Sequence, residues 1–246
     1  TKAPSLMTGS LETARAPRSP PSGLELTARS SSVVGTRSSQ VCLNRNQYPA
    51  MIEVIRVSGE AIRPYVKEVA RLRIEVFSEY PYLYDGSEDY EREYLSVYSA
   101  SERSVIVLAI RDGQVVGAST GLPLEDADEA FRKPFEDAQM DISRIFYFGE
   151  SVLRKSERSQ GIGHRFFDER ETHAREHGFS ITTFCAVQRS SDHPMKPDDY
   201  RENDAFWIKR GYEKAVGMVA ELGWEQIDQP GTETQNYLAF WLKRHS

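Results

Sequence analysis

The sequence predicts an α/β (α+β) protein with a mixed, mostly antiparallel central sheet and helices on both faces. Strand and helix patterns follow one another as β, α, α, β, β, (α), β, α, β, α, β, β, which suits a mixed sheet rather than an all-parallel one. Two strand patterns flank Asp112-Gly113, a dipeptide typical of antiparallel hairpins. A further strand pattern runs directly into a glycine turn and a helix.

The first half of the predicted fold is a strand, two helices and a hairpin, followed by a linker with helical potential. The segments are 52–57, 59–77, 87–98, 105–110 with 115–120, and 125–138. In the first helix Ile62, Val66 and Val69 are spaced three to four residues apart, which marks one apolar face. These elements would supply one side of the sheet and its first covering helices.

The second half is predicted as a strand, a helix, a strand, a helix and two closing strands. The segments are 145–153, 163–177, 181–187, 199–211, 212–223 and 237–242. Gly178 supplies the C-terminal stop of the first of these helices. Asp199 and Glu202 have capping-box spacing, which predicts that the second helix begins there and ends at Gly211.

The composition favours one domain of about 200 residues plus a tail. No apolar run approaches the ~20 residues needed to cross a membrane, so no membrane association is predicted. The net charge of −6 gives no support to nucleic-acid binding. Cys42 and Cys185 lie far apart in the sequence, which fits a reducing compartment and predicts a cytoplasmic protein with Cys185 buried in a strand.

Residues 1–50 differ from the rest of the chain. They hold six basic and two acidic side chains, are rich in Ser and Pro, and show no sustained apolar period. They are therefore predicted to be a disordered N-terminal extension, with the folded domain over 51–246. A transit-peptide remnant, which would place the protein in an organelle, and a non-native leader are both kept as alternatives.

The glycine turn lies in Leu153-Arg-Lys-Ser-Glu-Arg-Ser-Gln-Gly-Ile-Gly-His-Arg-Phe166. A strand, a glycine turn and a helix start in this order gather free backbone N–H groups at the positive end of a helix dipole, where a phosphate group binds well. A dinucleotide fold would place a third glycine where Phe166 stands. A P-loop would need Lys-Ser or Lys-Thr where His164-Arg165 stand. Both of those interpretations are rejected.

What remains is Arg/Gln-x-x-Gly-x-Gly, matched by residues 158–163, which resembles the acyl-CoA pyrophosphate loop of the GNAT (Gcn5-related N-acetyltransferase) family. Phe206-Trp-Ile-Lys-Arg-Gly-Tyr212 resembles the second signature of that family, an aromatic-rich helix ending in Lys-x-Gly-Phe/Tyr. The resemblance covers about residues 51–246. It implies acetyl-CoA as the acyl donor, bound where two parallel strands, 145–153 and 181–187, splay apart. By this resemblance the cofactor-binding residues are Val152, Leu153, Arg158, Ser159, Gln160, Gly161, Ile162 and Gly163.

Glu150 is the predicted general base that deprotonates the acceptor amine. It stands in a strand pattern of Ile, Phe, Tyr and Val, where a carboxylate is out of place unless it is paired or functional. The alternative is a strand-end glutamate that faces solvent or a nearby arginine. No metal is expected, because Ala174 interrupts the His-Glu-x-x-His pattern that His173 and His177 would need.

The general acid is where the sequence departs from the resemblance. Family members often have a tyrosine where Trp207 stands, and an indole cannot supply the proton. Tyr200, seven residues earlier and on the same face of the predicted helix, is the candidate acid, with packing as the alternative. Trp207 also keeps open a rival interpretation, a non-catalytic CoA-binding sensor or protein-interaction module.

The predicted acceptor is a small-molecule amine or a peptide lysine, and a homodimer is left open. Residues 78–94 are rich in Tyr, Asp and Glu, and residues 124–141 hold seven acids against two bases. Aromatic faces and carboxylates together favour a cation. Both segments are therefore expected to line an entrance of negative potential, with Asp85, Glu88 and Asp89 contributing to it.

Overall fold

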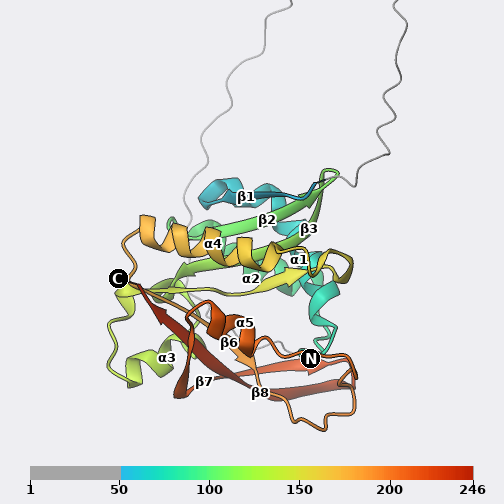
Figure 1. Cartoon of the computed structure of the whole chain (residues 1–246). Coiled ribbons are helices and arrows are strands. Elements are labelled where there is room, and N and C mark those ends of the chain that lie inside the picture. The colour runs from blue at the N-terminus through green and yellow to red at the C-terminus, as the bar shows by residue number, and fades with distance from the viewer. Residues whose placement is uncertain (1–50, 246) are drawn as a thin grey trace, which may run out of the picture. The chain divides into compact units, whose positions relative to one another are not determined.

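The computed structural model describes residues 51–245, and the fold class predicted from the sequence is confirmed (Figure 1). The extension predicted for residues 1–50 lies outside the described residues. The helices and strands are β1 Glu53–Val57, α1 Val66–Phe77, α2 Glu88–Ala100, β2 Val105–Arg111, β3 Gln114–Pro123, α3 Glu129–Asp137, β4 Ile145–Tyr147, β5 Ser151–Leu153, α4 Ile162–Glu176, β6 Ile181–Val187, α5 Asp204–Lys209, β7 Glu213–Gln226 and β8 Gln229–Arg244.

The central sheet has the strand order β1-β2-β3-β4-β6-β8-β7, and β5 also pairs with β3. Among the strands of residues 51–245, β4 and β6 pair in parallel and the other pairs are antiparallel. The β2–β3 hairpin turns at Asp112 and Gly113, both with positive φ, as a two-residue hairpin turn of this type requires. Within residues 51–245, no helix is long and apolar enough to span a membrane.

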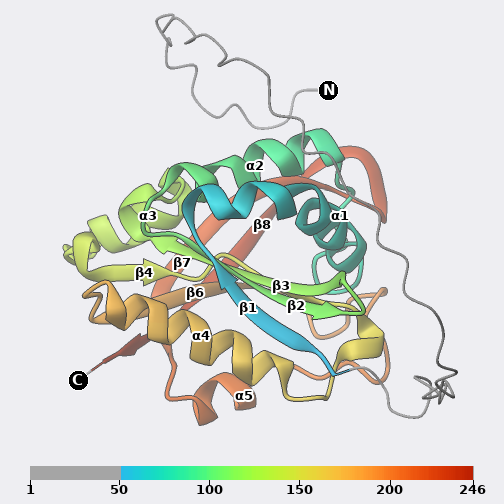
Figure 2. The same cartoon turned by 90° about the horizontal axis from the view of Figure 1, so that it is seen from above.

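Helices cover both faces of the sheet. Figure 2 shows α1 and α2 on one face and α4 and α5 on the other. Side chains along β2 alternate between the two cores: Ile106 and Leu108 belong to the core under α1 and α2, whereas Val105 and Val107 belong to the core under α4. A sheet buried on both faces explains why this strand is an uninterrupted apolar run.

The single strand predicted over 145–153 is broken in the structure, which corrects that prediction. β4 pairs with β6 as far as Tyr147, and the Phe148 N–H still donates to the Thr183 carbonyl at 2.7 Å. The Gly149 N–H then turns to the Thr120 carbonyl of β3, at 3.2 Å. A Cβ on Gly149 would lie 2.1 Å from the Tyr98 hydroxyl, so only glycine fits at this bend. Beyond it, β5 pairs with β3 alone and separates from β6.

The helix predicted to begin at Asp199 begins at Asp204 instead, and Asn203 precedes it without a side-chain cap. The capping box therefore does not form. The Tyr200 N–H donates to the Pro197 carbonyl at 3.0 Å in a preceding turn, and the Tyr200 ring packs edge-on against Tyr80 with centroids 4.7 Å apart. These contacts keep residues 199–203 in the loop between β6 and α5.

The closing hairpin of β7 and β8 is longer than predicted. Its strands continue to Gln226 and resume at Gln229, although residues 229–233 are exposed and include no large apolar side chain. Such residues pair through their backbone on a solvated hairpin, so they give no apolar alternation for a sequence pattern to detect.

Candidate active site

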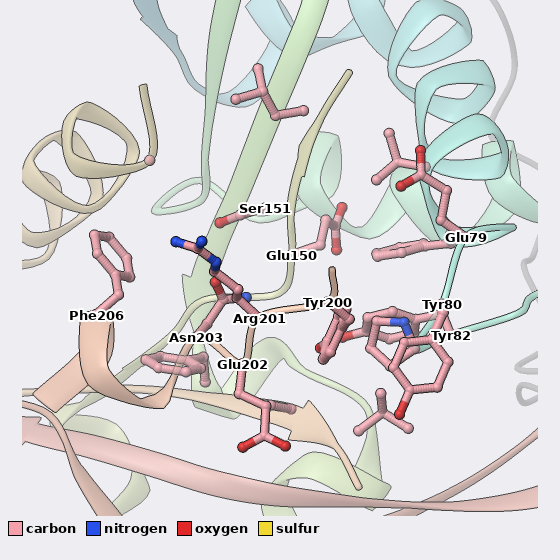
Figure 3. A pocket seen from close by; sticks show the side chains of 18 of the residues that line it. Glu79, Tyr80, Tyr82, Glu150, Ser151, Tyr200, Arg201, Glu202, Asn203 and Phe206 are labelled. Carbon is pink, nitrogen blue, oxygen red and sulfur yellow. The ribbon is translucent and has the colours of Figure 1, made fainter. Parts of the chain in front are cut away.

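A cleft of about 1030 Å³ opens where β5 and β6 separate. Ser151 and Leu153 line one wall, and Phe184 and Cys185 of β6 line the other. Figure 3 shows Glu150 and Ser151 on one side of this cleft, with Tyr80, Tyr82 and Tyr200 around another part of it. The glycine loop, the α1–α2 loop and the β6–α5 loop all border the cleft. The divergence of two strands thus produces a site enclosed by three loops.

The glycine loop joins this cleft to the N-terminus of α4. Gly161 is the residue before the helix and has φ +79°, a left-handed conformation that glycine adopts readily. A Cβ there would meet no atom within 4 Å, so the backbone is open to an approaching group. The first N–H groups of α4, from Ile162 and Gly163, have no acceptor within the helix. Together with the helix dipole they form a place for an anion.

Two side chains of the loop are already engaged. Arg158 Nη1 lies 2.9 Å from a carboxylate oxygen of Glu79, and its Nε donates to the Leu153 carbonyl at 3.1 Å. Gln160 donates to Glu157 at 3.3 Å, and its own side-chain oxygen accepts from Arg111 at 3.1 Å. Gln160 therefore anchors the loop on its outer side. Ser159 has φ +64°, so the loop bends sharply on either side of Gln160.

The β5 backbone directs its polar groups away from β3 at Ser151 and Leu153 rather than at Val152, and the Leu153 carbonyl accepts from Arg158. The Arg154 N–H donates to β3 at 3.0 Å, and the Glu150 carbonyl accepts from β3 at 3.0 Å. Because direction alternates along an antiparallel ladder, Val152, opposite Ala118, also turns its backbone toward β3. The Val152 side chain is fully buried in the core. Of the two residues predicted to hold the cofactor arm, only Leu153 lines the cleft.

Glu150 lines the cleft and is paired with an arginine, which was the alternative to a catalytic role, so its role as a base stays a prediction. Its side chain is 3% exposed, and its Oε2 lies 2.6 Å from Nη1 of Arg73 in α1. The Tyr94 hydroxyl donates to the same oxygen at 3.3 Å. The other oxygen, Oε1, is buried and has no hydrogen-bond partner among the described residues. Glu150 thus lines the cleft and keeps one buried oxygen without a partner in that part of the chain.

Arg170 is a wall residue that the sequence patterns did not reveal. It is 2% exposed and donates from Nη1 to the Thr120 and Glu150 carbonyls, both at 3.2 Å, and from Nη2 to the Ser151 hydroxyl at 2.8 Å. Burial lowers the pKa of this guanidinium to about 10. Arg170 therefore holds the bend between β4 and β5 in place and adds a positive charge beside it.

Tyr200 lies in the cleft lining, but in the β6–α5 loop rather than on a helix face. Burial is the main cause that raises its pKa, and the neighbouring Tyr80 adds to it, so the phenol keeps its proton at neutral pH. Trp207 also lines the cleft, with its ring 5.0 Å from that of Phe184 and 5.2 Å from that of Trp241. Tyr200 can therefore donate a proton, whereas Trp207 supplies an apolar wall.

The acidic entrance expected from the sequence does not form. Of residues 78–94 only 78–83 line the cleft, while Glu88 and Asp89 pair with Arg71 and Arg92 on α1 and α2. No described residue of 124–141 lines it, because α3 packs against β7 instead. The charged lining is mixed, with five acids and six bases: Glu79, Glu150, Asp199, Glu202, Asp204, Lys155, Arg158, Arg170, Arg189, Arg201 and Lys214.

Cys185 is buried, as predicted, but it also lines the cleft, so its suitability as a nucleophile has to be examined. Burial raises the pKa of this thiol to about 12. The thiolate is the nucleophilic form, so a thiol that stays protonated at neutral pH is poorly suited to covalent catalysis. Its sulfur lies 3.3 Å from the Tyr147 hydroxyl, which is consistent with a structural role.

Solved structures with the same arrangement identify the fold. A ribosomal-protein-alanine N-acetyltransferase from Brucella melitensis is 13% identical with a TM-score of 0.51, over 78% of this chain and 99% of that one. An acetyltransferase of the GNAT family from Staphylococcus aureus Mu50 is 13% identical with a TM-score of 0.50, over 80% and 100% of the two chains.

The chain has the GNAT acetyltransferase fold. An N-acetyltransferase from Staphylococcus aureus Mu50, 11% identical with a TM-score of 0.50 over 78% and 98% of the chains, adds a further example. No protein-family model matches the sequence, and no curated protein matches it either. At these identities the GNAT likeness is one of fold, and the chemistry has to be argued from the residues of the cleft.

Proposed function

We propose that this chain is an acyl-CoA-dependent N-acyltransferase that transfers acetyl from acetyl-CoA to a primary amine. The observation that carries the proposal is the continuous cleft from the α4 N-terminus, along β5, to Glu150. One end suits a pyrophosphate, and the middle suits an extended amide-bearing arm. The far end holds a carboxylate beside tyrosines. This order matches the chemical order of acetyl-CoA followed by an amine acceptor.

The donor substrate would be held mainly by backbone groups. The N–H groups of residues 161–163 would bind the pyrophosphate, and Arg158 would add a charge once released from Glu79. The Leu153 carbonyl, which now accepts from Arg158, would bind an amide N–H of the pantetheine arm. Gly161 and Gly163 suit this role because a Cβ at neither position would meet another atom closer than 3.8 Å. A bulkier side chain in this loop would fill the space that a phosphate needs.

The reaction would proceed by direct attack in a ternary complex. An alkylammonium gives one proton to the Glu150 carboxylate, and the nitrogen lone pair forms a bond to the thioester carbonyl carbon. The carbon–sulfur bond then breaks, and the electron pair leaves with the CoA sulfur. The Tyr200 hydroxyl donates its proton to that sulfur. It then accepts the second proton from the nitrogen, so that Tyr200 returns to its starting state. Glu150 finally releases its proton to water, so one proton appears in solution per turnover.

The acceptor is proposed to be a small-molecule amine or a peptide lysine. Tyr80, Tyr82 and Tyr200 supply aromatic surface around the acceptor end, and Glu150 supplies a carboxylate. Both groups bind an ammonium favourably. The mixed charge of the remaining lining leaves room for an acceptor that also carries an anionic group.

The rival function is a CoA-binding module without catalysis, and Trp207 is the residue that supports it. Its indole lines the cleft but cannot protonate a leaving thiolate. Such a module would bind acetyl-CoA without turning over any amine. The enzyme is favoured over this rival because three tyrosines line the same cleft, and a phenol, unlike an indole, can donate a proton to a leaving thiolate. They are Tyr80, Tyr82 and Tyr200.

Two measurements test the proposal. Thermal unfolding with saturating acetyl-CoA should show an increased Tm, because a ligand that binds only the folded state stabilises it, whereas NADH should not change it. Incubation with acetyl-CoA and a panel of amines should release free thiol in proportion to acetylated product. Stabilisation by NADH but not by acetyl-CoA would refute the cofactor assignment. Stabilisation by acetyl-CoA without thiol release on any amine would favour the rival.

A further inference from the structure

Three charged side chains form a buried cluster behind the cleft wall. Arg73 of α1 lies between Glu91 of α2 and Glu150: its Nε donates to Glu91, and its Nη1 lies 2.6 Å from Glu150. The side chains of these three residues are 8%, 0% and 3% exposed, respectively. One guanidinium is therefore shared by two carboxylates that are almost completely removed from water.

The cluster carries more negative than positive charge. Arg73 contributes one positive charge against the negative charges of Glu91 and Glu150, and Glu150 has no second ion-pair partner among residues 51–245. Arg170 is the other nearby cation. Its guanidinium bonds to the Glu150 carbonyl and to the Ser151 hydroxyl rather than to the carboxylate. Arg170 therefore offsets the excess only from a distance.

The remaining titratable groups around the cluster are neutral. They are Tyr82 and Tyr84 from the α1–α2 loop, Tyr94 and Tyr98 from α2, Tyr147 from β4 and Cys185 from β6. Burial is the largest cause that raises the pKa of each, so none supplies a charge near neutral pH. Tyr94 donates a hydrogen bond to Glu150.

Each carboxylate keeps one oxygen without a hydrogen-bond partner among residues 51–245, but only one of the two residues lines the cleft. Oε1 of Glu91 and Oε1 of Glu150 are buried without a hydrogen-bond partner in the described part of the chain. Glu91 does not line the cleft, whereas Glu150 does. An unpaired buried anion is costly, and a cation or a proton that arrives through the cleft would relieve this one.

We propose that Arg73 and Glu91 are positioning residues that keep Glu150 as an incompletely neutralised carboxylate, whose free Oε1 receives the ammonium group of the acceptor and accepts its proton. This inference rests on the proposed acyltransfer. Arg73 fixes the orientation of Glu150 through Oε2 and leaves Oε1 without a partner among the described residues. Glu91 competes for Arg73 and so prevents it from neutralising Glu150 fully.

The kinetic test uses Glu91→Gln, with Glu88→Gln as the matched control. Glu88 forms the exposed ion pair between α1 and α2, with Arg71 at 2.9 Å, one helical turn away from the buried pair. In Glu91→Gln, Arg73 can bind Glu150 fully, so kcat/KM for the amine should fall roughly tenfold. The acid limb of its pH profile should move to lower pH, while KM for acetyl-CoA stays within about twofold.

Tyr94→Phe should move the same limb in the opposite direction, because it removes the hydroxyl that donates to Glu150. Glu88→Gln should leave the profile in place. A merely structural role for Glu91 would reduce activity at all pH values without moving the limb. An unmoved limb in Glu91→Gln, or an equal movement in Glu88→Gln, would overturn the inference.

A stability measurement tests the cluster without any turnover. Glu150→Gln leaves Arg73 with Glu91 and removes the excess charge, so its Tm should lie within about 2 °C of wild type or above it. Arg73→Gln leaves two unpaired carboxylates and should lower Tm by about 8 °C or more. A large fall in Tm for Glu150→Gln would refute the inference, whether or not the chain is an enzyme. Failure of the wild type to acetylate any amine, with the Tm pattern intact, would refute the proposed acyltransfer alone.

Discussion

Arg158 of the glycine loop and Glu79 of the α1–α2 loop form an ion pair across the cleft, with Nη1 and Oε2 2.9 Å apart. The same guanidinium donates to the Leu153 carbonyl. A side chain predicted to bind pyrophosphate is thus held by the loop that carries Tyr80 and Tyr82 into the cleft lining. Binding of the donor substrate and release of Glu79 should therefore be coupled.

Glu79→Gln is expected to tighten CoA binding about two- to fivefold. The variant removes a partner that competes with phosphate for Arg158, and a half-exposed ion pair of this kind is worth about 0.2–1 kcal/mol. Isothermal titration with CoA measures the effect. Glu75→Gln is the matched control, because Glu75 pairs with Arg154 at 3.2 Å, and Arg154 lies outside the predicted phosphate-binding residues 158–163. Equal changes in the two variants, or weaker binding in Glu79→Gln, would show that Glu79 does not compete with the ligand.

Gly161→Trp is expected to abolish measurable CoA binding while the protein remains folded. The side chain would enter the open space before α4, and the left-handed backbone would cost about 1–2 kcal/mol. Gly178→Trp provides the control: Gly178 follows the other end of α4, with φ +82° and the same open surroundings. It should show a similar decrease in stability and normal CoA binding. Tight binding by Gly161→Trp would mean that the phosphates bind elsewhere.

Cys185→Ala should retain at least about half of the wild-type kcat. Direct attack by the amine needs no enzyme nucleophile, and burial raises the pKa of the Cys185 thiol to about 12, so little thiolate exists at neutral pH. Initial rates at varied acetyl-CoA and amine concentrations should give intersecting lines in both proteins. Parallel lines in the double-reciprocal plots of the wild type, together with loss of activity in Cys185→Ala, would instead indicate an acetyl-cysteine intermediate.

The sequence predicted the parts of this molecule that depend on local chain chemistry. Asp112-Gly113 predicted the hairpin turn because both residues must adopt positive φ. The glycines at 161 and 163 predicted the start of α4, which begins at Ile162. The break between β4 and β5 was not visible, because it arises from the Tyr98 hydroxyl of a distant helix closing on Gly149. Long-range contacts of this kind leave no periodic pattern in either segment.

The same limit explains the site residues. Glu150 was found because a carboxylate in an apolar strand is conspicuous, whereas Arg73 and Glu91 resemble ordinary polar positions on amphipathic helices. Arg170 was similarly hidden in the α4 pattern, although its guanidinium is buried under the bend. The acidic residues of 78–94 and 124–141 led to the opposite error, because they were predicted to line the cleft and most do not. Charge composition does not show which face of a helix borders a cleft.

Histidine burial predicts a stability change at mildly acidic pH. His173 of α4 is 5% exposed, and its Nε2 lies 2.9 Å from the Arg103 carbonyl, which requires that nitrogen to carry a proton as donor. Burial is the main cause that lowers the pKa of His173 below its usual 6.5. Between the two values the unfolded chain binds a proton that the folded protein does not, so the free energy of unfolding should fall as pH drops below about 6.5.

Urea unfolding at pH 7.5 and pH 5.5 measures this change in the free energy of unfolding. Between these two pH values, protonation of His173 should lower the free energy of unfolding of the wild type by up to about 1 kcal/mol. In His173→Gln this contribution should be absent, so the total decrease should be smaller by that amount. Some pH dependence should remain, because burial also lowers the pKa of His245. His164→Gln, at an exposed position of the same helix, controls for the substitution itself. An identical pH dependence in wild type and His173→Gln would show that His173 takes up its proton as easily in the folded protein as in the unfolded chain.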